Sequence, residues 1–258
     1  MPSFLTDFSN LIITDPFFYV VAIPAALIFG ISKSGFGAGF GSLAVPLMAL
    51  AIPVSQSAAI FMPILLATDL LAMSALRKTV DKPLLKFILC WGVLGVVIGY
   101  FTFRVLDSHV VSGILGFVTL LFLAHRLLFK QPDHPVYLPK WFGAIMSTLG
   151  GFTSFIAHSG SPPLNTYLLP MRLPPLVFSA TLSYHFFALN MAKWIPYVAL
   201  GWLDRKGLAT AIVLLPLAPV GVWLGINVAK RVSQQLFYHL VHTGMFLTGL
   251  KLLWDGFQ

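Results

Sequence analysis

Long blocks of apolar residues, separated by short polar or glycine-rich breaks, run from about residue 17 to the end of the chain. A helix needs about 20 mainly apolar residues to cross a bilayer, and the longer blocks reach that length. They cover about 54–76, 84–103, 108–129, 175–200, 207–229 and 236–254. The shorter blocks come in two pairs, at about 17–32 with 42–53 and at about 141–157 with 164–171. Barrel strands would be shorter and would alternate, so the pattern predicts an all-α polytopic membrane protein.

Each short pair is divided by a break that does not suit a spanning helix. In the first break, Ser32–Gly41, a lysine is followed by four glycines within seven residues, and the second break is His158–Pro163. Glycine lets backbone N–H groups approach a ligand closely, and the N-terminal end of a helix attracts anions. Inside a bilayer, broken backbone is tolerated only where protein or a water-filled cavity surrounds it. The breaks predict a buried anion site; the alternatives are a glycine-rich packing interface between helices or a bent loop.

The two halves of the chain resemble each other. A shift of 121 positions brings Gly39 onto Gly160 and Asp69 onto Asn190. The same shift aligns Pro53 with Pro174 and Ala59 with Ala180. Further along the chain the shift grows by five positions, and Gly95–Gly99 then aligns with Gly221–Gly225. We therefore predict one membrane domain made of two repeats, 1–130 and 131–258. Each repeat has a short broken or re-entrant helix pair plus three long spanning helices. Corresponding Gly/Pro-interrupted segments in two halves indicate the binding site of a transporter.

The distribution of basic residues predicts the orientation. A hairpin returns the chain to its starting side and three spans then invert it, so the repeats have inverted topology. Ten basic residues then fall on one side, and Arg104, Arg205, Lys206 and Lys251 fall on the other. The positive-inside rule makes the first side cytoplasmic. Both termini are then expected to face outward, on the side opposite the cytoplasm.

Composition agrees with a membrane protein and excludes several other classes. The 258 residues are 58% hydrophobic and 9% charged, with mean hydropathy +0.89, and no soluble domain is expected. The net charge of +8 fits basic loops that face anionic lipid rather than a nucleic-acid partner. There is no Cys/His metal spacing and no phosphate-binding Gly-Lys-Ser/Thr loop. We therefore expect no enzyme, metal or cofactor, and no cleaved signal peptide at the N-terminus.

A few ionisable residues lie inside the apolar blocks, where they are costly and commonly functional. They are Lys33, Asp69, His158, His185 and Lys193. Lys193 follows Asn190 by three residues, so both are expected on one helix face, where they would bind an oxyanion. The alternative for Lys193 is a side chain that reaches out to the membrane interface.

The other three allow more than one role. Asp69 is expected to pair with Lys33 or Lys193 or to carry a coupling proton or cation, with a purely structural ion pair as the alternative. His158 would donate to an anion or titrate during transport, unless it is merely hydrogen-bonded. His185 lacks such a context and is expected to pack or to support the site from behind. Ser34, His158 and Asp69 do not identify an activated nucleophile.

The motifs around these residues resemble those of the TauE/SafE sulfite exporter family, also called the toluene sulfonate uptake permease family. In the first half the resemblance lies in Ser32–Gly39 with Pro46 and in Pro63–Asp69. In the second half it lies in Gly151–Pro163, Tyr167–Pro170, Phe186 and Asn190–Lys193. Ser161 departs from the pattern, since many relatives carry a second glycine there. The resemblance covers nearly the whole chain and implies a bacterial inner-membrane transporter of sulfur-containing anions.

Together these observations predict a secondary transporter, expected to be an exporter, that works by alternating access. Its substrate would be sulfite or a small organosulfonate, held near the midplane between the two broken pairs. The predicted binding residues are Lys33, Ser34, Gly35, Gly37, Gly39, His158, Ser159, Gly160, Asn190 and Lys193, with Asp69 for charge pairing or coupling. A passive anion channel and a membrane assembly factor without transport activity are the alternatives. The choice of anion, the direction, a coupling proton or sodium ion and a homodimer all stay open.

Overall fold

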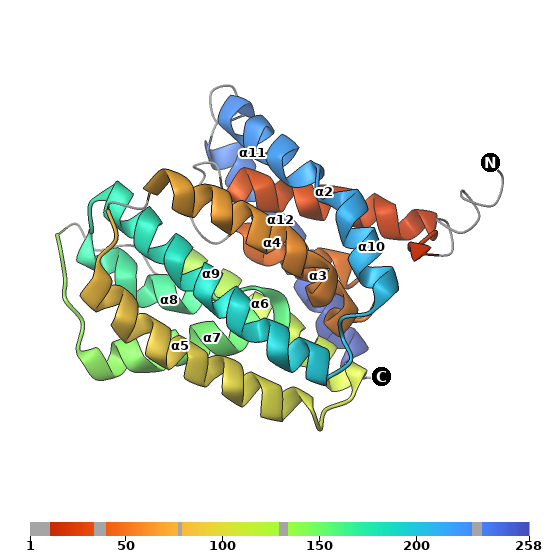
Figure 1. Ribbon diagram of the computed structural model, residues 1–258, viewed down its shortest axis with the longest axis horizontal. Coiled ribbons are helices and arrows are strands. Elements are labelled where there is room, and N and C mark those ends of the chain that lie inside the picture. The colour runs from red at the N-terminus through yellow and green to blue at the C-terminus, as the bar shows by residue number, and fades with distance from the viewer. Residues whose placement is uncertain (1–10, 34–39, 77–78, 129–133, 229–233, 258) are drawn as a thin grey trace.

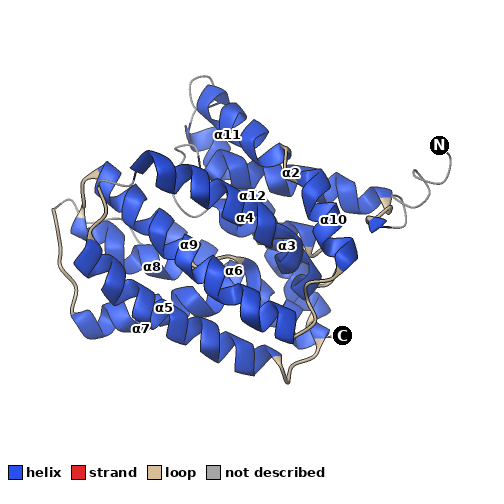
Figure 2. Cartoon of the chain, in the orientation of Figure 1, coloured by secondary structure: helices blue, strands red, loops and turns tan. Residues whose placement is uncertain are grey.

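The computed structural model describes residues 11–33, 40–76, 79–128, 134–228 and 234–257, and every regular element in these ranges is a helix (Figure 2). The first half contains α2 (Pro16–Lys33), η1 (Phe40–Leu43), α3 (Ala44–Met48), α4 (Val54–Leu76), α5 (Lys82–Phe103) and α6 (Ser108–Leu128). The second half contains α7 (Lys140–Ala157), α8 (Ser161–Leu168), η2 (Leu169–Met171), α9 (Pro175–Ala199), α10 (Arg205–Leu214), α11 (Leu217–Val228) and α12 (Gln234–Asp255). The all-helical prediction is confirmed for the described residues.

The starts of α5 and α10 follow local sequence signals. The carboxylate of Asp81 accepts a hydrogen bond from the backbone N–H of Leu84 at 3.0 Å and so caps the start of α5. Asp204 caps α10 in the same way through Gly207. The single run expected at 207–229 is instead two helices, α10 and α11. They are separated at Pro216, whose missing N–H and bulky ring interrupt a helix.

The centre of the bundle is the contact between α4 and α9, which lie between two flanking helix pairs in Figure 1. One flanking pair is α2 with α11, and the other is α5 with α7. Both pairs depend on glycine. A Cβ on Gly30 of α2 would collide with the backbone of Gly221, and a Cβ on Gly151 of α7 would collide with the backbone of Gly92. Helices therefore approach each other closely through small residues, as is common in membrane proteins.

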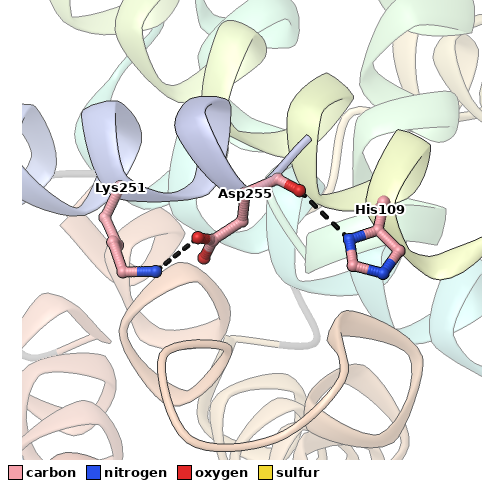
Figure 3. A network of polar contacts seen from close by, with 3 residues as sticks. All are labelled: His109, Lys251 and Asp255. Atoms are coloured by element: carbon pink, nitrogen blue, oxygen red, sulfur yellow. Dashed lines mark hydrogen bonds and ion pairs between the residues drawn. The ribbon is translucent and has the colours of Figure 1, made fainter. Parts of the chain in front are cut away.

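The helices α6 and α12 form a further extensive pair. A Cβ on Gly116 would collide with the backbone at Gly249 and Leu253, so this interface also needs glycine. At one end of the pair, the Nδ1 of His109 donates to the backbone carbonyl of Asp255 at 3.2 Å (Figure 3). The carboxylate of Asp255 forms an ion pair with Lys251 one turn earlier on α12. The His109 contact joins the start of α6 to the end of α12.

The connections between helices gather at the two ends of the bundle (Figure 1). The α5–α6 and α9–α10 connections lie at the same end as the first and last described residues. The α4–α5 and α8–α9 connections lie at the other end, where the backbone N–H of Asp81 bonds to the hydroxyl of Thr181 at 3.1 Å. The chain therefore runs back and forth along one axis, as a polytopic membrane protein requires.

By length and composition alone, two described helical stretches could cross a membrane, Lys82–Phe103 and Arg205–Leu224. Shorter apolar helical stretches are Pro16–Ile31, Val54–Leu70 and His109–His125. Many large apolar side chains on the outside of the bundle are exposed, among them Phe101, Ile195 and Trp223. This exposed apolar surface is what a hydrocarbon surrounding would cover.

Candidate functional site

The second break is a short turn between two helices that end and begin inside the protein. α7 ends at Ala157, and His158 follows in the left-handed conformation with φ of 53°. The hydroxyl of Thr153 donates to the carbonyl of Ser159 at 2.9 Å, which closes the turn. Gly160 faces the carbonyl of Gly150 so closely that a Cβ would not fit. The break is therefore shorter than predicted, because Ser161, Pro162 and Pro163 already belong to the first turn of α8.

Lys193 of α9 is fully buried and points at this turn. Its Nζ donates to the backbone carbonyl of Ser154 at 2.9 Å and to the Ser154 hydroxyl at 3.1 Å. It also lies 2.7 Å from the Nδ1 of His158. The ammonium group thus binds three neutral acceptors near the C-terminal end of α7, where the helix dipole favours a cation. The alternative that Lys193 reaches out to the membrane interface is wrong.

His158 joins this lysine to the other half of the protein. Since the ammonium of Lys193 can only donate, the Nδ1 of His158 must accept. The other ring nitrogen, Nε2, then carries the proton and donates to the carbonyl of Ala58 in α4 at 2.8 Å. The bonds run from α9 through the turn to α4. His158 is therefore hydrogen-bonded on both sides, which agrees with the more modest of the two roles predicted for it.

A second buried polar contact lies between the central helices. The side-chain amide of Asn190 in α9 donates to the carboxylate of Asp69 in α4 at 2.7 Å. Both residues are buried, with exposed fractions of 2% and 0%. The carboxylate also interacts electrostatically with Lys193. Asn190 faces α4 whereas Lys193 faces α7, so the predicted common face is only partly correct.

The first break is less fully described. Lys33 is the last residue of α2, and its side chain lies outside the described part of the structure. The predicted residues Ser34, Gly35, Gly37 and Gly39 also lie outside the described residues. In the second half, Ser159 and Gly160 are buried in the turn beside His158. The structure thus brings His158, Lys193, Asp69 and Asn190 together between α4, α7 and α9.

Three participants in this arrangement were not predicted. Ser154 provides two acceptors for Lys193, and its place one helical turn before His158 could have suggested it. The carbonyl of Ala58 carries no sequence signal, because any residue has one. Tyr197, one turn after Lys193, donates its hydroxyl proton to the carbonyl of Phe155, another carbonyl in the last turn of α7.

His185 was expected to pack, and the structure buries it completely against α5. Its ring lies over Gly92, where a Cβ would come within 2.9 Å of the ring. It also makes an edge contact with Phe186, with ring centroids 5.1 Å apart. Among the described residues, neither ring nitrogen has a hydrogen-bond partner. His185 is therefore packed as expected, but at the cost of two unsatisfied polar atoms.

Comparison with known proteins identifies the family. A family model described as "Sulfite exporter TauE/SafE" matches residues 22–252, which is nearly the whole chain. No curated protein and no solved structure matches the chain. The match includes both helix breaks and all the buried polar residues between α4, α7 and α9. The chain belongs to the sulfite exporter TauE/SafE family of membrane transporters.

Proposed function

We propose that this protein is a secondary transporter that moves a small sulfur-containing anion, sulfite or an organosulfonate, by alternating access. The observation that carries the proposal is the environment of Lys193. Its ammonium group is fully buried and is held by the carbonyl and hydroxyl of Ser154 and by the ring of His158, all of which are neutral. By contrast, the exposed Lys251 is paired directly with a carboxylate. A buried cation held by neutral acceptors favours the arrival of an anion.

The acceptors around Lys193 stand where oxygens of the substrate would lie. The carbonyl and hydroxyl of Ser154 occupy positions that two oxygens of a sulfite or sulfonate group would take in the bound state. We propose that substrate replaces one of them and that Ser159 and Gly160, in the turn beside His158, border the same anion. Lys33 and the following Ser34, Gly35, Gly37 and Gly39 would complete the site from the first half.

Asp69 and Asn190 would act at the centre of the same site. In this structure, the amide of Asn190 is bound to the carboxylate of Asp69 rather than facing a ligand. We propose that the carboxylate balances the lysine charge when substrate is absent and that Asn190 becomes a donor to substrate when the pair separates. A coupling proton or sodium ion would act through Asp69, the carboxylate of the pair.

The packing supports two inverted repeats. α2 packs on α11 as α7 packs on α5, and α4 contacts α10 as α9 contacts α5. In the proposed repeats, α2 corresponds to α7, α4 corresponds to α9, and α5 corresponds to α10 and α11. Each contact between two helices therefore has a counterpart made by the corresponding helices of the other half. Gly30 and Gly151, which meet α11 and α5, are 121 positions apart, as are Asp69 and Asn190. Such an arrangement is expected when two similar halves are related by a pseudo-twofold axis.

The charge distribution supports a definite orientation in a bacterial inner membrane. In the sequence, ten Lys and Arg residues lie in or beside the α4–α5, α6–α7, α8–α9 and α11–α12 connections, and four lie beside the α5–α6 and α9–α10 connections or near the end of α12. The described parts of the α4–α5, α6–α7 and α8–α9 connections lie at one end of the bundle (Figure 1). By the positive-inside rule this end would face the cytoplasm. The opposite end, which holds the first and last described residues, would face the periplasm.

The test is uptake of labelled sulfite, and separately of a labelled alkanesulfonate, into vesicles that contain the purified protein. Lys33→Ala and Lys193→Ala should each abolish saturable uptake, whereas Lys206→Ala, at an exposed lysine of α10, should leave it unchanged. Ser154→Ala, which keeps the carbonyl acceptor, should retain the fold and weaken uptake. Unchanged uptake in both site lysine variants would contradict the proposed site. Flux that never saturates would indicate a channel instead, and indifference to every anion would favour an assembly factor.

A further inference from the structure

A cavity of about 510 Å³ lies beside the second break, and Thr153 and Ser159 of the turn form part of its lining. One wall is the second half of α6, from Phe117 to Leu128, and the opposite wall is α7 with the first turns of α8. Met245 of α12 closes the remaining side. The inner end of the cavity reaches Ser159 and Pro162, so whatever fills it contacts the turn between α7 and α8.

The lining of this cavity does not suit an anion. Thr119 donates its hydroxyl proton to the carbonyl of Leu115 at 2.7 Å, and Thr166 donates to the carbonyl of Pro162 at 3.2 Å. The hydroxyls of Thr153 and Ser159 also donate to backbone carbonyls nearby. Since these hydroxyl protons are already used, they offer no donor that could replace the hydration of a charged group. The part of an occupant that lies against these residues must therefore be apolar.

The cavity is open toward the surface of the bundle. Phe117, Leu121 and Leu149 line it and have exposed fractions of 58%, 57% and 43%. In a member of a membrane transporter family, an exposed apolar surface of this kind faces the acyl chains of the bilayer. A hydrocarbon chain can therefore enter the cavity sideways, without crossing a polar surface.

The sequence at one end of the cavity indicates the headgroup. His125 and Leu128, near the end of α6, line the cavity at the bundle end where α7 begins with Lys140. Arg126, Lys130 and Lys140 flank the connection between α6 and α7 in the sequence. Clustered basic residues beside an apolar helix attract anionic lipid headgroups.

We propose that the cavity between α6 and the α7–α8 unit is a binding site for one acyl chain of an anionic phospholipid. The headgroup lies at the basic end, and the end of the acyl chain packs against Ser159 and Pro162. The lipid thereby supports the turn that positions His158 and Lys193. This inference requires only that the protein lies in a membrane. The lipid site can therefore be refuted while the transport function holds, and the transport function can be refuted while the lipid site holds.

The experiment is native mass spectrometry of the purified protein titrated with phosphatidylglycerol or phosphatidylcholine. The wild-type protein should retain one phosphatidylglycerol after weakly held lipid is removed, and it should retain phosphatidylcholine less well. Val118→Trp fills the cavity and should lower the affinity for phosphatidylglycerol about tenfold, as expected when contacts with a few methylene groups are lost. Val97→Trp, at an exposed valine of α5 that does not line the cavity, is the matched control and should bind like the wild type.

A second filling variant, Ala124→Phe, keeps the test informative if Val118→Trp does not fold, which a thermal unfolding scan would show. Equal retention of phosphatidylglycerol by the wild type and every folded filling variant would overturn the proposal. Equal affinity for the two lipids would overturn the headgroup placement. Dodecanesulfonate tests the alternative that the cavity holds the tail of a substrate. If one dodecanesulfonate binds to the wild type without displacing phosphatidylglycerol, and this binding is lost in Val118→Trp, the cavity holds the substrate tail and the lipid site is refuted.

Discussion

Asn190 donates a 2.7 Å hydrogen bond to Asp69 across a sequence interval of 121 residues, the same interval that aligns the two halves of the chain. The two residues belong to α4 and α9, two helices that pack against each other. The pair therefore lies where α4 and α9 cross, at the centre of the bundle. A residue type that differs between the halves, aspartate in one and asparagine in the other, lets the two side chains bond instead of repelling each other.

Exchanging the two residues should preserve this contact. Asn190→Asp alone places two carboxylates face to face in a buried site, and we expect a loss of about 3–5 kcal/mol of stability, as for other broken buried charge contacts. The double variant Asp69→Asn with Asn190→Asp rebuilds the bond with reversed direction and should recover most of that loss. A double-mutant cycle by thermal unfolding in detergent measures the coupling. Additive effects of the two substitutions would show that the contact contributes nothing.

Lys193 should matter for the fold as well as for transport. Lys193→Met keeps the length of the side chain and removes all three hydrogen bonds to Ser154 and His158. It also removes the positive charge of Lys193 that interacts with the Asp69 carboxylate, so the variant should be clearly less stable than the wild type. Adding Asp69→Asn should restore part of the stability, because the buried negative charge is then removed as well. Lys206→Met, at an exposed position of α10, should change the stability little. Thermal unfolding of the wild type, Lys193→Met, the double variant and Lys206→Met measures these differences.

The glycine contacts between helices should tolerate no side chain. Gly151→Ala puts a methyl group against the backbone of Gly92, and backbone atoms cannot move aside without separating α5 from α7. We expect the variant to lose several kcal/mol of stability or to fail to fold, as overpacked sites do. Gly244→Ala is the control, because its Cβ would meet only the end of the Leu43 side chain at 3.2 Å. Yields and melting temperatures that are alike for the two variants would contradict this packing.

His185 should be replaceable by an apolar residue without loss of stability. Its ring is fully buried, and among the described residues neither nitrogen has a partner. An unsatisfied buried polar atom costs about 1–3 kcal/mol, so His185→Leu should be as stable as the wild type or more stable. The matched comparison is His158→Leu, which removes two hydrogen bonds. It also places leucine in a left-handed backbone conformation, which histidine adopts more readily than leucine. Stability should fall in that variant; a fall of equal size in His185→Leu would refute the prediction.

Much of the helical structure could be predicted from the sequence, because a bilayer restricts which segments can be helices. α4 begins and ends where the apolar run predicted, at Val54 and Leu76, since helices in hydrocarbon must be apolar and of limited length. The split between α10 and α11 was missed although Pro216 was visible, because proline is tolerated inside other helices of this chain, such as Pro63 in α4. Sequence alone does not decide which prolines break a helix.

The candidate site could be predicted as a set of residues but not as a set of bonds. Lys193, His158, Asp69 and Asn190 stand out because charged and amide groups are rare in apolar runs. Their partners do not stand out. Ala58 contributes a backbone carbonyl, which every residue has, and Ser154 is one of several hydroxyl residues in α7.

By itself, the sequence determined that this chain is a helical membrane protein with a few polar and charged residues inside its apolar runs; the two repeats stay a prediction. Local composition is enough for that, since the cost of placing polar groups in hydrocarbon acts on each segment separately. Only the tertiary structure decided that Lys193 binds the end of α7, that His158 reaches α4 and that Asp69 meets Asn190. These contacts join segments distant in sequence, and their geometry depends on how closely glycine lets the helices pack.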